Sequence, residues 1–355
     1  MTIKKSGWKL LPCLGLVLPL LLVSQEVQAQ ADFFKGKTLT LVYGSTPGGI
    51  GDMRVRALVP FIRKHMPGEP GIVLEFMPGG AGRKAANYIY GVARPDGLTL
   101  GGAPGSFIAS AILAEPGVNY DLAKLVYLGS SESATHYTFL SRKEAGLETL
   151  EKLRAATGVR IGAQAVGHAV YVTGRLFAYF LGLKEPKFVT GYSSAELDLA
   201  LVRGEIDARA ETTSSIVNRN PDWIDKGMMH FHAVLEIPKG AHHPRFARLP
   251  ELEDFVSSQK ERELLALFRA FRHVGITPYF LPPGVSRDRA AILQEAFRKA
   301  LRDPRFHREY KKLTGDEPTP ILPDEQEKIM RGISRAPEII ALFKKFPGPD
   351  PLPRR

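Results

Sequence analysis

The sequence predicts an α/β protein of two lobes, each containing a mostly parallel sheet flanked by helices. Two observations support this class. Strands, glycine-rich turns and helices follow one another in order, and this pattern occurs in two separate blocks of the chain. The end of the chain is different, because its periodicity is helical only. A mature chain of about 325 residues is long enough for two medium-sized domains.

The first block contains three runs rich in apolar and β-branched residues, each bounded by turn residues. The expected strands are residues 38–43, 72–76 and 98–102. A helix beginning near Asp52 follows the first strand, and a helix over residues 83–93 follows the second. Helical connections of this kind join strands that run in the same direction.

The second block repeats the scheme, with strands expected at residues 159–163, 187–190 and 206–210. A long helix follows the turn 164–168, and a helix over 195–203 ends at Gly204 in a left-handed cap. Helices are expected at about 286–301, with Ser286 as N-cap, and at about 324–346. We assign residues 32–130 and 272–355 to lobe I and residues 131–271 to lobe II.

Residues 1–31 have the pattern of a cleaved signal peptide. A lysine-rich start precedes an apolar run over 10–23, and the small-residue triplet Ala29-Gln30-Ala31 ends the segment. The apolar run is shorter than the roughly 20 residues that span a bilayer. The single cysteine, Cys13, lies inside this run, so the mature chain has no disulfide and no zinc–thiolate site. We therefore expect a periplasmic protein.

The chain is basic, with 48 Lys+Arg against 37 Asp+Glu and a formal charge of +11. The basic residues are interspersed with acidic ones, which is typical of a solvated surface rather than of a nucleic-acid footprint. We expect no nucleic-acid partner, and we expect the mature chain to act as a monomer.

Three glycine-rich loops follow strands and precede helices: Ser45–Asp52, Pro78–Arg83 and Gln164–His168. Ligands of open α/β sheets bind at the carboxyl ends of the strands. A helix N-terminus there offers free N–H groups and a partial positive charge, and glycine allows close approach, so anions are the natural ligands. A tight turn without a ligand is the alternative for each loop.

Nucleotide motifs fail in these loops. Gly44 and Gly49 have the spacing of a phosphate loop, but Ile50 stands where that motif requires lysine, and no loop contains G-x-G-x-x-G. A carboxylate fits better, because a few converging N–H and hydroxyl donors suffice to bind it. Arg83 and Lys84 either face the bound anion or point into solvent. We expect no cofactor.

At these loops the sequence resembles the Bug-type receptors of tripartite tricarboxylate transporters. Three motifs of the first block carry the resemblance: Ser45–Asp52, Pro78–Gly82 and Pro95–Gly97. The segment Tyr192–Ala208 resembles the family's tyrosine turn, helix and G-x-[VI]-D-A segment. The resemblance covers most of the mature chain and is weakest from about 231 to 272.

The resemblance implies a periplasmic-binding-protein type II-like fold with two crossovers between the lobes. It implies a receptor that binds a small organic carboxylate in an interlobe cleft and docks transiently with membrane transporter subunits. By position it implies the ligand-contacting residues Ser45, Thr46, Gly48, Gly49, Ile50, Gly51, Asp52, Gly79, Gly80, Ala81, Gly82, Arg83, Ala103, Ser106, Gly167, His168, Tyr192 and Ser193.

Three departures from the family pattern bear on the ligand. Gly51 stands where a hydroxyl residue is common, and Arg83-Lys84 stand where small or polar residues are common. The stretch Arg209–Glu211 is more charged than the family pattern, and we include Glu211 as a further candidate ligand residue.

Two other function classes stay open at this point. A ligand-binding sensor that presents a carboxylate to a membrane signalling protein has the same sequence features as a transport receptor. A hydrolase or metal-dependent enzyme needs a converging catalytic set. The candidates are His168, the pair His230 and His232, the pair His242 and His243, and the carboxylates Asp207 and Glu211. No carboxylate completes a metal pattern near the histidines, so we expect neither a metal site nor an enzyme.

Overall fold

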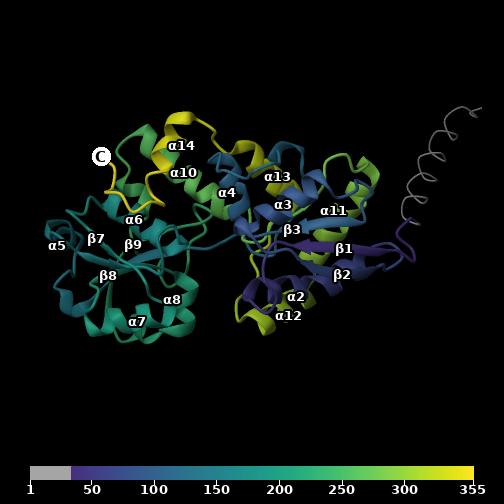
Figure 1. The fold of residues 1–355 in the computed structure, drawn as a ribbon. Helices are drawn as coiled ribbons and strands as arrows, with labels where there is room; N and C mark the ends of the chain where they lie inside the picture. Colours follow the sequence, from purple (N-terminus) through teal and green to yellow (C-terminus); the bar gives the residue numbers. More distant parts are fainter. Residues whose placement is uncertain (1–32) are drawn as a thin grey trace, which may run out of the picture.

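The structure is a computed structural model, and it describes residues 33–355. The predicted signal peptide lies outside the described residues. Figure 1 shows two lobes beside each other, the first in purple and blue and the second in teal. Each lobe has a five-stranded sheet flanked by helices, which confirms the predicted α/β class. Within residues 33–355, none of the helices has the length and apolar character needed to cross a membrane.

The sheet of lobe I has the strand order β2-β1-β3-β10-β4. Its strands are β1 (Thr38–Tyr43), β2 (Gly71–Phe76), β3 (Thr99–Gly102), β4 (Val126–Gly129) and β10 (Tyr279–Leu281). The pairs β1–β2 and β1–β3 are parallel, and β10 runs antiparallel to both of its neighbours. Successive side chains of β1 point to opposite faces of the sheet and pack into two different hydrophobic cores. Leu39 and Leu41 lie in one core and Val42 lies in the other.

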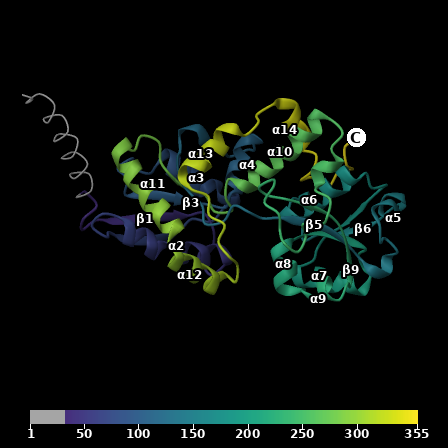
Figure 2. The same cartoon turned by 180° about the vertical axis from the view of Figure 1, so that it is seen from behind.

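Helices cover both faces of this sheet. They are α2 (Ile50–His65), α3 (Arg83–Gly91), α4 (Ser106–Ile112), α11 (Arg287–Arg302), α12 (Pro304–Thr314) and α13 (Pro323–Gly332), with the short turns η1 (Gly80–Gly82) and η2 (Leu122–Lys124). Helices α2, α11 and α12 pack together over one face, and α3 contacts β3 on the other. Figure 2 shows α11 and α2 beside β1 from behind.

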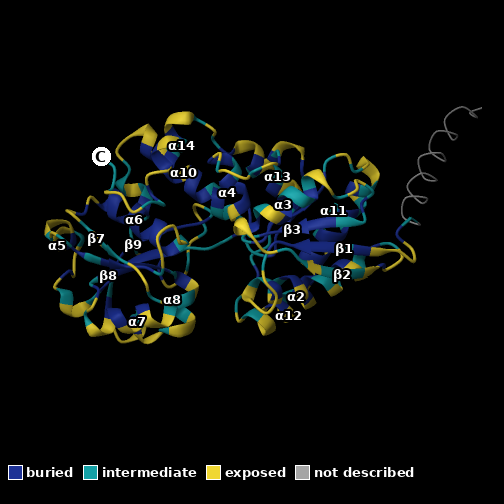
Figure 3. Ribbon diagram, in the orientation of Figure 1, coloured by how far each residue is buried: buried dark blue, intermediate teal, exposed yellow. Residues whose placement is uncertain are grey.

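The sheet of lobe II has the equivalent order β7-β6-β8-β5-β9. Its strands are β5 (Tyr137–Arg142), β6 (Arg160–Gly162), β7 (Lys187–Val189), β8 (Ala208–Thr212) and β9 (Met229–Leu235). The helices and short turns of this part of the chain are η3 (Lys143–Ala145), α5 (Leu150–Ala155), α6 (Ala169–Leu181), α7 (Ser194–Arg203), α8 (Thr213–Arg219), α9 (Asp222–Asp225), η4 (Leu252–Phe255) and α10 (Gln259–His273). Figure 3 shows the inner strands of both sheets as largely buried and the outer helices as partly exposed, and the edge strands β2 and β7 are also partly exposed.

The two sheets share one topological device. In each, the fourth position holds a strand that arrives from the other lobe and runs antiparallel to its neighbours: β10 in lobe I and β5 in lobe II. The segments 130–136 and 274–278 connect the two lobes. Each enters its sheet at the edge where the parallel strands have their carboxyl ends. In each lobe, the glycine loops that follow the parallel strands therefore lie at the edge of the sheet where the crossovers enter.

The end of the chain differs from the sequence prediction in two ways. The predicted helix over 324–346 is two helices, α13 and α14 (Pro337–Phe343), because the segment before Pro337 is extended. Residues 345–350 then lie on α6, where Arg175 donates to the carbonyls of Lys345 and Asp350 at 3.2 and 2.6 Å. The lobe boundaries drawn from the sequence stay a prediction, and the last residues contact lobe II.

Candidate functional site

The first loop is closed by its own aspartate. The carboxylate of Asp52 is buried and accepts a hydrogen bond from the Gly48 N–H at 2.8 Å, while Arg56 pairs with its other oxygen at 2.6 Å. The Gly48 N–H is therefore already used. The N–H groups in the first turn of α2, which begins at Ile50, have no acceptor within the helix and remain available to an anion. Ser45, Thr46 and Gly49 complete this loop, which is largely exposed.

Gly51 is required by a tyrosine beneath the loop. A Cβ at Gly51 would lie 2.3 Å from the hydroxyl oxygen of Tyr43, a buried residue at the end of β1. A hydroxyl residue at this position would clash with the ring of Tyr43. The departure of Gly51 from the family pattern is thus a packing consequence of Tyr43.

The second loop has a conformation that glycine makes possible. Gly79, Gly80, Ala81 and Gly82 all have positive φ, at 139°, 56°, 56° and 94°. The hydroxyl of Ser106, at the start of α4, donates to the Ala81 carbonyl at 2.9 Å and holds the loop against lobe I. Only glycine adopts the backbone of Gly79 without strain.

The three loops of lobe I converge at small residues. A Cβ at Gly44 would lie 3.1 Å from the Cβ of Ala103 and 3.2 Å from the Cα of Gly82. A Cβ at Gly82 would in turn lie 3.1 Å from the Cβ of Ala103. The structure therefore brings the predicted segments 45–52, 79–83 and 103–106 together at the carboxyl edge of the sheet.

Arg83 is engaged within its own lobe. Its Nη1 lies 2.7 Å from Oε2 of Glu115, and both side chains are partly exposed. Pairs of this exposure contribute little to stability, typically about 0–1 kcal/mol. The pair nevertheless gives Arg83 a partner other than a ligand.

In lobe II, several predicted residues act as helix caps. His168 Nδ1 accepts from the Val170 N–H at 3.3 Å at the start of α6, beside Gly167 with φ of 79°. Ser193 and Glu196 form a reciprocal capping box on α7, and the ring of Tyr192 is half-buried beside this turn. Partial burial lowers the pKa of His168, and the nearby Arg272 cation acts in the same direction.

Glu211 is committed to internal ion pairs. Its buried carboxylate contacts Arg209, lies 3.2 Å from Arg219 and accepts from the Thr212 N–H at 2.8 Å. Arg209 is fully buried and also pairs with Asp198 at 2.6 Å. These contacts account for the charged stretch that departs from the family pattern.

The other candidate carboxylate, Asp207, binds Arg160 of the neighbouring strand β6. It accepts from the backbone N–H of Arg160 at 3.0 Å and pairs with the Arg160 guanidinium at 2.6 Å. Strand β8 begins at Ala208, two residues later than predicted, although the Asp207 N–H still donates to the Arg160 carbonyl at 2.9 Å. The hydrogen bonds from Arg160 lower the pKa of Asp207 despite its burial.

The candidate histidines lie in separate places, although His243 of one candidate pair packs near His136, with ring centres 6.3 Å apart. His232 is buried on β9 and lies 2.8 Å from the Ser141 hydroxyl, and burial lowers its pKa to about 4. His242 contacts Glu236 at 2.5 Å on another part of lobe II. Among residues 33–355, no group of three or more His, Cys, Asp or Glu side chains is arranged to hold a metal ion.

A polar cluster at the crossover was not predicted from the sequence. Arg54 of α2 pairs with Glu132 of the connecting segment at 2.7 Å, and Tyr310 of α12 donates to Glu132 at 2.8 Å. Arg54 also donates to the Tyr310 hydroxyl at 3.1 Å. This cluster fixes the helix that carries the first loop to the segment that leads into lobe II.

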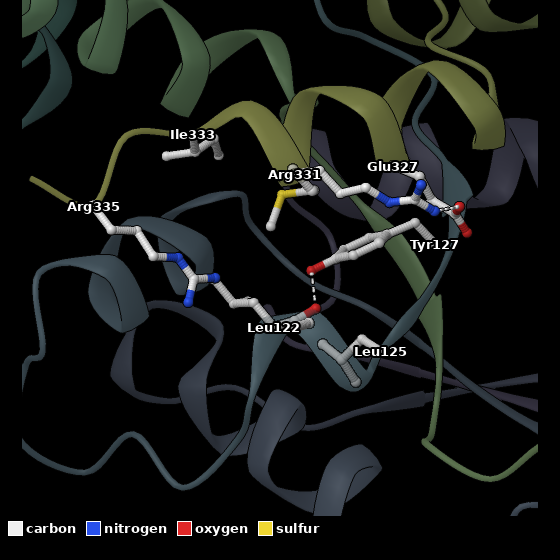
Figure 4. Close-up of a pocket in the computed structure, with 9 residues that line it drawn as sticks. Leu122, Leu125, Tyr127, Glu327, Arg331, Ile333 and Arg335 are labelled. Atoms are coloured by element: carbon white, nitrogen blue, oxygen red, sulfur yellow. Dashed lines mark hydrogen bonds and ion pairs between the residues drawn. The ribbon is translucent and has the colours of Figure 1, made fainter.

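A cavity of about 610 Å³ lies away from these loops, between η2, β4 and α13 of lobe I. In Figure 4, Tyr127 donates to the Leu122 carbonyl across its floor, and Arg331 pairs with Glu327 at its edge. None of the predicted ligand residues lines it.

Solved structures of periplasmic solute-binding proteins share this topology. A TctC solute-binding protein from Polaromonas superposes with a TM-score of 0.65 at 17% identity, over 87% of this chain and 97% of that one. MatC from Rhodopseudomonas palustris, with bound malate, gives 0.54 at 19% identity over 86% and 99%. An R. palustris protein with adipate gives 0.53 at 18% identity over 87% and 97%.

No protein-family model matches the sequence, and no curated protein matches it either. Because these three structures are only 17–19% identical to this chain in sequence, their similarity shows a shared fold and no more. It confirms the predicted two-lobed architecture of the Bug and TctC type.

Proposed function

We propose that this protein is an extracytoplasmic receptor that captures a small carboxylate between its lobes and delivers it to a tripartite tricarboxylate-type membrane transporter. The observation that carries this proposal is the convergence of three loops at the carboxyl edge of the lobe I sheet, where the first turn of α2 leaves N–H groups free. The malate- and adipate-bound structures of the same fold support a carboxylate as the ligand.

The chemistry of the site favours binding over catalysis. Four side chains that could act as catalysts serve structure: Glu211 and Asp207 in ion pairs, and His168 and Ser193 as caps. None of these four is hydrogen-bonded to another of them as a nucleophile to a base, which is the arrangement that catalysis requires. We therefore propose a receptor and not an enzyme.

The test is a screen of mono-, di- and tricarboxylates by thermal shift on protein purified from the envelope. At least one acid is expected to raise the melting temperature, since ligand that binds only the folded state stabilises it. X-ray scattering is then expected to show contraction, because a ligand that touches both lobes favours the closed state. No stabilising acid, or chemical conversion of the bound acid, would contradict the proposal.

Export is tested separately. The lysine-rich start, the apolar run and Ala29-Gln30-Ala31 predict that the envelope form begins near Gln30 or Asp32. Amino-terminal sequencing or intact mass spectrometry measures this directly. Soluble envelope protein that retains Met1 would contradict cleavage.

A further inference from the structure

Arg272, near the end of α10, is a half-buried cation with aromatic neighbours but with no acceptor for its N–H groups in the described chain. It makes no hydrogen bond and no ion pair within residues 33–355. Among the same residues every lysine is exposed, and each of the other arginines that is not exposed donates to a carboxylate or a carbonyl. Burying a cation without a hydrogen-bonding or ionic partner costs free energy. A bound anion would supply the partner that Arg272 lacks.

The guanidinium of Arg272 lies near two aromatic rings. Its central carbon is 5.9 Å from the ring centre of Tyr137 and 5.7 Å from that of Phe268. Cation–π contacts of this kind attract the guanidinium to the rings and leave its N–H edge able to donate. Such an edge matches the two oxygens of a carboxylate.

Arg272 lies between predicted ligand loops of both lobes. Gly275, three residues later, touches lobe I, where a Cβ at Gly105 would come within 2.5 Å of the Gly275 carbonyl oxygen. On the other side, Tyr137 pairs in register with Thr212 at the end of β8, and Arg272 is close enough to lower the pKa of His168.

The carboxylates whose charge reaches the same region are already neutralised. Glu211 and Glu132 both act on Tyr137, but Glu211 pairs with Arg209 and Arg219, and Glu132 pairs with Arg54. Neither of these two carboxylates is therefore left to serve Arg272.

Apolar side chains are also exposed on or beside the predicted loops. Ile50 and Met53, in the first turn of α2 in lobe I, are 45% and 40% exposed, and Val166 of lobe II is 49% exposed. Apolar side chains on ligand loops of both lobes are suited to cover the carbon chain of a ligand.

We infer that Arg272 binds a second carboxylate of the ligand, so that the receptor takes a dicarboxylate with apolar carbons between its acid groups. The first carboxylate lies at the glycine loops of lobe I, and on this point the inference rests on the proposed function. Arg272 then determines specificity, because it distinguishes two acid groups from one.

The test compares straight-chain dicarboxylates of four to eight carbons with monocarboxylates of the same length, adipate against hexanoate among them. Calorimetry is done on the wild type, Arg272→Gln, Arg272→Lys and the control Arg335→Gln, which removes an exposed arginine at the lobe I cavity. The best dicarboxylate is expected to bind about tenfold more weakly to Arg272→Gln, with a smaller loss for Arg272→Lys, since lysine keeps the charge but not the fork. Arg335→Gln is expected to change affinity by less than about twofold.

The affinity for the matched monocarboxylate is expected to be the same in the wild type and Arg272→Gln. Circular dichroism confirms that each variant is folded. Equal binding of the dicarboxylate by wild type and Arg272→Gln, or a monocarboxylate that binds as well as its dicarboxylate, would overturn the inference and leave the receptor intact. Failure of the wild type to bind any mono-, di- or tricarboxylate would instead overturn the proposed function.

Discussion

Replacing Arg54 with methionine is expected to lower the free energy of unfolding by about 3–5 kcal/mol at pH 7. Arg54 and Glu132 are each only 12% exposed and lie 2.7 Å apart. Methionine fills much of the same space, so the main loss is the cation that neutralises the buried Glu132. A buried carboxylate without its cation is among the more costly single changes in a protein.

The loss is expected to depend on pH with a defined sign. Burial raises the pKa of Glu132, while Arg54 and the hydrogen bond from Tyr310 act against this rise. Without Arg54 the pKa rises further, so the folded variant holds a proton at a pH where the unfolded chain has released it. Its stability therefore falls as pH rises from the ordinary glutamate range toward neutrality, and it recovers on acidification.

Urea unfolding at pH 5 and pH 7, with the wild type measured at each, checks this. The double variant Arg54→Met/Glu132→Gln is the control, because it removes both charges and is expected to recover part of the stability at pH 7. An equal loss at both pH values, with no recovery in the double variant, would show that the ion pair is not the cause.

The fold was predictable because its signals are local. The alternation in β1, with Leu39 and Leu41 on one face and Val42 on the other, is readable from six consecutive residues. The glycine turns and the left-handed cap at Gly204 are likewise set by neighbours in the chain. Repetition of these units in two blocks was enough to predict two lobes.

The burial of the long helix α6 could not be predicted from local sequence patterns. Its pattern predicts one apolar face, but the whole segment from Val170 to Leu181 is buried. The polar face is covered because Arg175 donates to carbonyls about 170 residues later, and Phe346 packs on Tyr179. A contact over that separation leaves no periodic trace in the sequence.

The candidate site was likewise predictable in part. The positions of the glycine loops followed from the strand–turn–helix order, but the state of each polar side chain did not. Whether Arg83 is free depends on Glu115, and whether Glu211 is free depends on Arg209 and Arg219. Arg272 stands out only after the partners of every other half-buried cation are known.

Replacing Gly79 with valine is expected to weaken binding of the ligand found in the carboxylate screen by about tenfold to a hundredfold, with the fold retained. The backbone at Gly79 has φ of 139° and ψ of 145°, a region that valine reaches only with strain of about 1–3 kcal/mol. A Cβ there would meet only the Lys84 side chain, at 3.5 Å, so the strain falls on the loop and not on the core. The loop is expected to relax and to redirect its N–H groups, each worth about 1.5–3 kcal/mol when bonded to a charged ligand.

Two matched variants distinguish added side-chain bulk from backbone strain as the cause of weaker binding. Gly49→Val tests bulk alone, since Gly49 has φ of −87° and a Cβ there meets nothing within 4 Å. Gly146→Val tests strain alone, because Gly146 has φ of 70°, also has open space and lies in lobe II after η3, away from the loops. Calorimetry is expected to show a loss for Gly79→Val and Gly49→Val but not for Gly146→Val. Wild-type affinity in both loop variants would mean that the glycine loops of lobe I do not hold the ligand.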